Sequence, residues 1–194
     1  MFEVRIHGRG GQGVVTAAEL LSAAAFLAGR QSQAFPTFGS ERMGAPVTAF
    51  CRISEKFIRS REPVGKPDAL IIQDSTLLHH VPVFEGLPTS GYVLINSTRS
   101  FDELGLEDLL QKVPSNRCRT VPATQLALEQ VGRPLPNAAL LGAFAAMTNQ
   151  VAIEFIESAI RERFTGQMGE ANAAAARAAY DLVLRKDEIH AKAS

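Results

Sequence analysis

Hydrophobic residues along the first 134 positions alternate between the spacing of strands and the spacing of helices. Apolar side chains at every second position of residues 2–7 predict a strand, and a wide apolar stripe over residues 13–28 predicts a helix that packs on a sheet. The runs at 69–73 and 91–96 are almost continuously apolar, which is typical of strands buried on both faces of a parallel sheet. Further strands are expected at 31–35, 47–53 and 117–121, with 57–59 pairing with 47–53 after a turn.

Helices are expected between these strands and again towards the C-terminus. The pattern predicts helices over 102–112 and 123–131, and a short helical crossover within 75–84 that Pro82 interrupts. This alternation favours an α/β fold with an open, mostly parallel, Rossmann-like sheet flanked by helices. We expect one domain over 1–194, with an α/β core at about 1–134 and a helical part at about 135–190. The helical part should contain helices over 137–147, with Asn137 as a candidate cap, over 153–164 and over 169–186.

Composition and charge narrow the classes of function. The 194 residues include 20 basic and 20 acidic side chains, and a net charge of zero gives no support for general nucleic-acid binding. Cys51 and Cys118 each lie in a strand-like run, which predicts two buried, reduced thiols. Since no C-x-x-C pair occurs, we expect no iron–sulfur cluster in this chain. No apolar run of about 20 residues and no leader pattern is present, so we expect a soluble, cytoplasmic protein with no membrane partner.

A glycine-rich turn, His7-Gly8-Arg9-Gly10-Gly11-Gln12-Gly13, separates the first predicted strand from the first predicted helix. Gly8, Gly10 and Gly13 have the G-x-G-x-x-G spacing. Between a strand and a helix, this spacing is typical of a turn that binds the phosphates of a nucleotide. Gly8 would allow a sharp turn, Gly10 would let the backbone approach a phosphate, and Gly13 would let helix and strand come close. The free N–H groups and the positive dipole end of the helix favour an anion there.

Two alternatives to a phosphate site of this kind stay open. A stand-alone NAD(P)-dependent oxidoreductase should carry an acidic residue at the end of the next strand, but residues 30–35 contain none, and Glu41 comes too late. The turn also lacks the Gly-Lys-Ser/Thr sequence of a P-loop. In the second alternative the turn binds nothing and serves only to pack the helix against the strand.

Other candidate residues have an ordinary structural interpretation beside the functional one. The loop over 35–46 is either a rigid surface loop or an aromatic and guanidinium surface beside the glycine turn, suited to a nucleotide or a partner subunit. His79 and His80 are better explained as exposed or capping residues than as metal ligands. Asp74 and Asn96 follow apolar runs, where open α/β sheets bind ligands, but each equally suits the cap of a following helix.

Four stretches of the sequence together resemble the gamma subunit of the 2-oxoacid:ferredoxin oxidoreductases of the pyruvate kind. In chain order they are HGRGGQGVVTAAELL, FPTFGSERMGAPVTAFCRIS, PDALIIQD and PNAALLGAFA. The resemblance covers almost the whole chain, and its specific part is GRGGQG combined with FGSERMGAP. Relatives often have two arginines where this chain has Arg42-Met43, so a role of the second arginine does not carry over.

The resemblance implies a cytoplasmic multi-subunit enzyme that oxidatively decarboxylates a 2-oxoacid and forms acyl-CoA and CO2. Thiamine diphosphate with Mg²⁺ and 4Fe–4S clusters would belong to alpha, beta and delta-type partner subunits. The electron acceptor would be ferredoxin or a flavin subunit. The choice of 2-oxoacid, whether pyruvate or an aromatic one such as phenylglyoxylate, would rest with those partners.

For this chain the resemblance implies a subunit without redox or catalytic residues of its own that helps to form the CoA site. The glycine amides, two hydrogen-bonding side chains and the arginine charges are the expected contacts with the CoA phosphates. These candidate binding residues are Arg9, Gly10, Gly11, Gln12, Gly13, Thr16 and Arg42.

Overall fold

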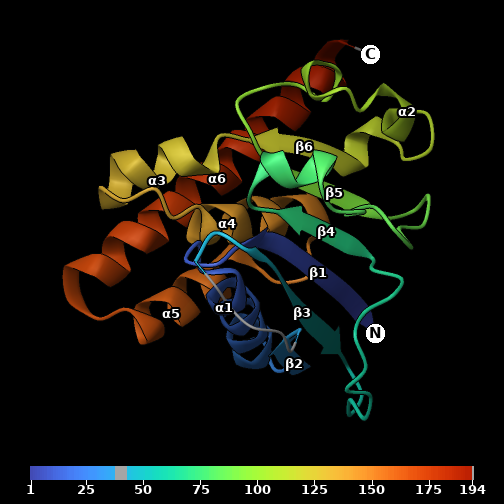
Figure 1. Cartoon of the computed structure of the whole chain (residues 1–194). Coiled ribbons are helices and arrows are strands. Elements are labelled where there is room, and N and C mark those ends of the chain that lie inside the picture. The colour runs from blue at the N-terminus through green and yellow to red at the C-terminus, as the bar shows by residue number, and fades with distance from the viewer. Residues whose placement is uncertain (38–42, 194) are drawn as a thin grey trace.

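A six-stranded sheet with the strand order β2-β3-β1-β4-β5-β6 forms the centre of the structure (Figure 1). The computed structural model describes residues 1–37 and 43–193, with side chains up to residue 186. The strands are β1 (Phe2–Arg9), β2 (Gln31–Pro36), β3 (Pro46–Ser54), β4 (Ala69–Ile72), β5 (Tyr92–Asn96) and β6 (Cys118–Val121). The ends of β1 lie within two residues of the predicted range, and those of the other strands within one residue.

The sheet is parallel on one side of β1 and contains an inserted antiparallel strand on the other. β1, β4, β5 and β6 pair in parallel, whereas β3 runs antiparallel to both β1 and β2. Five of the six strands therefore point the same way, which confirms the mostly parallel α/β sheet. The prediction that 57–59 pairs with β3 is wrong, because β1 and β2 already occupy both edges of β3.

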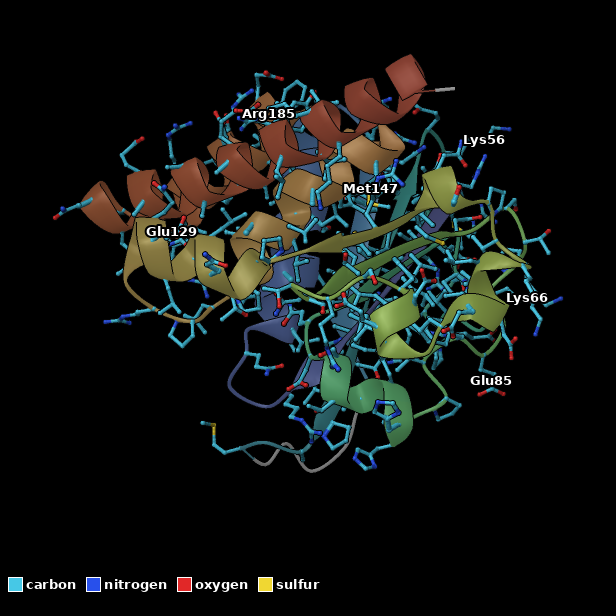
Figure 2. The ribbon with its side chains drawn as sticks, turned by 90° about the horizontal axis from the view of Figure 1, so that it is seen from above. Lys56, Lys66, Glu85, Glu129, Met147 and Arg185 are labelled. Carbon is cyan, nitrogen blue, oxygen red and sulfur yellow. The ribbon has the colours of Figure 1, made fainter. Side chains whose placement is uncertain are left out.

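The larger helices gather on one face of the sheet. They are α1 (Val14–Leu27), α3 (Ala123–Val131), α4 (Asn137–Thr148), α5 (Ile153–Arg163) and α6 (Gly166–Ala193). Helix α4 is buried around nearly its whole circumference, because it lies between β5 and α6. Seen from above, α6 runs across the outside of this layer beside α3, with Glu129 and Arg185 on the outer surface (Figure 2).

The opposite face is covered by short helical turns. These are η1 (Ser75–His79), η2 (Asp102–Leu104), α2 (Glu107–Leu110) and η3 (Ser115–Arg117). The helix predicted over 102–112 is divided in two, since Gly105 adopts a left-handed conformation with φ 69° between η2 and α2. The crossover predicted within 75–84 is helical only at its start, in η1. Both cysteines are buried and free as predicted, Cys51 in the core under the large helices and Cys118 in the core on the opposite face.

Two C-terminal predictions need adjustment. Asn137 is the first residue of α4 rather than its cap, and its Oδ1 accepts a hydrogen bond from the Ala138 N–H at 2.9 Å. Helix α6 starts at Gly166, before the predicted start at 169. Among the described residues no helix is both long enough and apolar enough to cross a membrane.

Buried polar side chains of β1 hold the loops of the second face in place. Arg5 donates hydrogen bonds to the carbonyl oxygens of Val64, Val83 and Glu85. Its Nε also donates to His7 Nε2 at 3.1 Å, which requires a neutral imidazole on His7. Burial, together with the positive charge of Arg5, lowers the pKa of His7 to about 4.

We predict that replacing Gly142 by alanine destabilises the fold. A Cβ on Gly142 would lie 1.9 Å from the carbonyl oxygen of Ala176 in α6, so α4 and α6 would have to separate. Overpacking of this kind costs about 1–3 kcal/mol, which outweighs the helix preference of alanine. Chemical denaturation of G142A measures the loss. The control is G65A, where an added Cβ meets no atom within 4 Å, and an equal loss in both variants would contradict the assignment.

We predict that His7 makes the protein acid-sensitive. His7 has a folded pKa of about 4 and an unfolded pKa near 6.5, so only the unfolded chain gains a proton as the pH falls between these values. His7 therefore does not lower the free energy of unfolding above about pH 6.5. Below that pH it lowers the free energy of unfolding by about 1.4 kcal/mol per pH unit, down to about pH 4. Denaturation of H7Q across this range should show a shallower decline than the wild type. H79Q, at an exposed histidine, is the control for loss of an imidazole, and parallel curves for H7Q and the wild type would refute the prediction.

Candidate functional site

The glycine turn holds the end of β1 close to two helices. Gly8 lies within β1, and a Cβ there would lie 2.6 Å from Val14 Cγ2 at the start of α1. Gly8 therefore provides the close approach of strand and helix that we predicted for Gly13, and the prediction that it makes the sharp turn is wrong. The turn itself is made by Gly11 and Gly13, which have φ values of 92° and 71°. A Cβ on Gly13 would lie 2.7 Å from Asn137 Nδ2 of α4, so Gly13 allows α4 to approach the turn.

The C-terminal end of the loop over residues 35–46 pairs with this glycine turn. Gly10 N donates to Ala45 O at 2.9 Å, and Gly44 N donates to Gly10 O at 3.1 Å. Met43 forms an isolated parallel bridge with Gly10, and 86% of its side chain is exposed. The expected position of this loop beside the glycine turn is thus confirmed for residues 43–45. Arg42, a predicted binding residue, lies outside the described residues.

Arg9 and Gln12 form a hydrogen-bonded network with Asp74, the residue that follows β4. Arg9 Nε lies 3.2 Å from Asp74 Oδ2, and Arg9 Nη2 donates to Thr76 Oγ1 at 2.8 Å. Gln12 accepts from the Arg9 backbone N–H at 2.8 Å and donates to Asp74 Oδ2 at 2.9 Å. The backbone N–H and the hydroxyl of Thr76 both donate to Asp74 Oδ1, at 3.0 and 2.6 Å. The charge of Arg9 is therefore already paired within the site.

The Asp74 carboxylate stays ionised in this network. Burial by itself raises the pKa of Asp74, but hydrogen bonds from Thr76 and Gln12 and the charge of Arg9 outweigh it, so the pKa lies below its ordinary value. Asp74 also caps η1 through Thr76, which confirms the capping interpretation. Arg9 thus compensates an anion of the protein itself and contributes little net positive charge to a ligand.

A hollow of about 320 Å³ lies at the start of α1. Arg9, Gly10, Gly11, Gly13 and Thr16 line it, together with Val14, Val15 and Val47. The N-cap residue of the helix is Gly13, which has no side chain to cap it, and the first turn contains no acidic residue. The first intrahelical bond runs from Ala17 N to Gly13 O, so the preceding N–H groups have no intrahelical acceptor. A helix start with free N–H groups and no acidic residue favours an anion.

A second hollow of about 540 Å³ lies on the other side of the same turn, at the carboxyl ends of β4 and β5. Its wall contains Gly10, Gly11, Gln12, Met43, Gln73, Asp74, Ser75, Asn96, Thr124, Pro134, Leu135 and Pro136. Asn96 accepts from the Thr124 backbone N–H at 3.1 Å, so it caps α3 rather than the next helix along the chain.

Gln73, in the wall of this hollow, was not predicted from the sequence as a functional residue. The available signal was a polar side chain at the end of an otherwise apolar run.

The order of the strands argues against an NAD site, and the positions of His79 and His80 argue against a metal site. In a dinucleotide-binding sheet the strand after the first helix lies next to β1, but here β3 separates β2 from β1. The end of β2 is therefore one strand too far from the turn to hold the ribose of a bound NAD. His79 and His80 are exposed, and among the described residues no group of three or more His, Cys, Asp or Glu side chains is placed to hold a metal ion.

Comparison with known proteins yields similarity over nearly the whole chain. A family model described as pyruvate ferredoxin/flavodoxin oxidoreductase matches residues 3–182. The chain is 51% identical over 181 residues to the pyruvate/ketoisovalerate oxidoreductases common subunit gamma of Pyrococcus furiosus, covering 93% of this chain and 96% of that one. It is 47% identical over 186 residues to pyruvate synthase subunit PorC of Methanocaldococcus jannaschii, covering 96% and 99% of the two chains.

A solved structure shares the fold as well. The crystal structure of pyruvate oxidoreductase subunit PORC from Thermotoga maritima superposes with a TM-score of 0.78 at 37% identity. The superposition covers 93% of this chain and 95% of that chain. The fold of nearly the whole chain therefore has a counterpart in an experimentally determined protein.

Proposed function

The chain belongs to the pyruvate ferredoxin/flavodoxin oxidoreductase family, and we propose that it is the gamma subunit of a multi-subunit 2-oxoacid oxidoreductase of the pyruvate type. The complex oxidatively decarboxylates a 2-oxoacid and forms acyl-CoA and CO2. The names of the relatives support this role, since they are a common subunit gamma of pyruvate and ketoisovalerate oxidoreductases and a pyruvate synthase subunit. In the Pyrococcus furiosus relative, the same gamma subunit serves two oxidoreductases with different substrates. This supports the proposal that other subunits determine the substrate.

The redox cofactors belong, in this proposal, to the partner subunits. A cluster of the 4Fe–4S type needs four cysteine thiolates, but this chain has two cysteines, buried in separate cores on opposite faces of the sheet. Burial also raises the pKa of both thiols, which disfavours the thiolate that a metal requires. Alpha, beta and delta-type subunits would hold thiamine diphosphate, Mg²⁺ and the clusters. Ferredoxin or a flavin subunit would accept the electrons in the cytoplasm.

The chain itself contributes to the CoA site through the hollow at the start of α1. The observation that carries this proposal is the uncapped first turn of α1, which faces a hollow lined by Gly10, Gly11, Gly13 and Thr16. Backbone N–H groups in this arrangement suit the phosphates of CoA. Arg9 and Gln12 mainly orient the turn, because both are bonded to Asp74. Arg42 remains a proposed contact from its place in the sequence.

A purely structural glycine turn is the second candidate, and a specific observation favours it. The tight contacts at Gly8 and Gly13 explain two of the glycines by packing alone. These contacts do not explain why the first turn of α1 lacks both a side-chain cap and an acidic residue. The test must therefore separate binding from packing.

We expect this chain to copurify with its partner subunits. After mild purification from its native cells, the preparation should contain iron-rich proteins and reduce a dye in a reaction that needs both a 2-oxoacid and CoA. Pyruvate, 2-ketoisovalerate and phenylglyoxylate, tried separately, would identify the substrate. A colourless monomer or homo-oligomer without this activity would contradict the subunit role.

We also expect T16E to weaken CoA binding without harming the fold. A carboxylate in the first turn of α1 interacts favourably with the helix dipole, so stability should be unchanged or higher by about 0.3–1 kcal/mol. The same carboxylate repels a phosphate in the hollow, and the KM for CoA of the assembled complex should rise about tenfold or more, equivalent to about 1.4 kcal/mol. T16Q, equal in size but neutral, is the matched control. An unchanged KM for CoA in T16E would support the packing alternative.

A further inference from the structure

The side chain of Gln73 is buried without a partner in the part of the chain that the structure describes. Only 1% of the residue is exposed, and neither Oε1 nor Nε2 has a hydrogen-bond partner. The backbone around it is fully paired, since Gln73 N donates to His7 O at 2.8 Å and Gln73 O accepts from Asn96 Nδ2 at 2.8 Å. The backbone of Gln73 is therefore fixed at the end of β4, while its carboxamide makes no hydrogen bond with the described residues.

An unpaired buried carboxamide is unfavourable for the protein alone. Folding removes the amide from water without replacing its hydrogen bonds, whereas an apolar side chain of the same shape would avoid that loss. Buried polar groups in proteins are almost always paired, and an exception is explained by local strain, a functional role, or a bound water, ion or ligand. Gln73 thus has a cost in the free protein that a hydrogen-bonding ligand would remove.

The place of Gln73 in the fold points to a ligand. It is among the residues around the 540 Å³ hollow at the carboxyl ends of β4 and β5, where open α/β sheets bind small molecules. Both polar atoms of its side chain are inaccessible to solvent, so the carboxamide pairs with a ligand there only by rotating towards the hollow. Two polar neighbours in the same wall are already engaged: Asn96 bonds Thr124, and Gln12 bonds Asp74. Gly10 and Gly11 line both this hollow and the one at the start of α1, so the two hollows adjoin at these glycines.

We propose that the hollow at Gln73 binds a neutral part of the ligand that has an N–H donor beside a hydrogen-bond acceptor, paired with the Gln73 carboxamide. A carboxamide offers one acceptor and two donors, so it matches another amide or the edge of an adenine. This inference rests on the proposed CoA function, because the phosphates would occupy the adjoining hollow at α1. CoA has two sources of the required chemistry, the secondary amides of its pantetheine arm and its adenine base.

The variant Q73M tests this pairing, because methionine keeps the length of the side chain and removes both polar atoms. The melting temperature of the free assembled complex should stay the same or rise, while the Kd for CoA should increase about tenfold. Q33M is the matched control, since Gln33 also has a buried, unpartnered Oε1 but lies on β2, away from the hollow. Its Kd for CoA should equal that of the wild type.

Two fragments distinguish the sources of the hydrogen bonds. If the adenine pairs with Gln73, Q73M weakens binding of adenosine 3′,5′-bisphosphate and leaves binding of 4′-phosphopantetheine unchanged. The reverse result assigns the contact to the pantetheine amides. In the ¹⁵N-labelled full chain, the side-chain NH2 signals of Gln73 should shift with CoA while those of Gln33 do not, which needs no variant at Gln73.

The results that overturn the inference are separate from those that overturn the CoA site. An unchanged Kd for CoA in Q73M, with unshifted Gln73 NH2 signals and weaker binding in T16E, rules out the Gln73 contact and leaves the CoA site at α1. An unchanged Kd in both variants, or no CoA binding by the wild-type complex, removes the CoA site as well.

Discussion

The close approach of α1 to the end of β1 and to the start of α4 is the constraint on which the site depends. A Cβ on Gly8 would lie 2.6 Å from Val14, and a Cβ on Gly13 would lie 2.7 Å from Asn137, so a side chain at either position would displace a neighbouring side chain. These contacts hold the first turn of α1 against the carboxyl edge of the sheet. As a result, the two hollows of the candidate site share one wall, formed by Gly10 and Gly11.

Charges around the turn are balanced within the protein. Asp74 remains ionised and is compensated by Arg9, while Gln12 joins the two through hydrogen bonds. Once these side chains are paired, the described residues still present backbone N–H groups of α1 and the carboxamide of Gln73 without hydrogen-bond partners. In the proposed site, a ligand would be selected by the placement of hydrogen-bond donors and acceptors more than by net charge.

Most of the secondary structure followed from local sequence patterns. Of two wrong predictions, one has its cause in the local sequence and the other in contacts between distant segments. The strands and the large helices of the described chain lie close to their predicted ranges, because burial of one or two faces imposes a spacing that can be read directly. The helix over 102–112 was overestimated, because Gly105 favours a left-handed break over continuing the helix. The pairing of 57–59 failed for a different reason. Whether an edge of β3 is free depends on strands distant in sequence, and β1 and β2 occupy both edges.

By itself the sequence determined the fold class, the glycine turn between β1 and α1, and the resemblance to gamma subunits, because spacing and residue type are local properties of the chain. Only the tertiary structure decided that β3 separates β1 from β2, that Arg9 is paired with Asp74, and that the Gln73 side chain has no partner among the described residues. These facts depend on side chains and strands that folding brings together from distant positions, such as Gln12 and Asp74, 62 residues apart. A polar residue at the end of an apolar run looks the same in sequence whether its hydrogen bonds are satisfied or not. Its neighbours in space decide which it is.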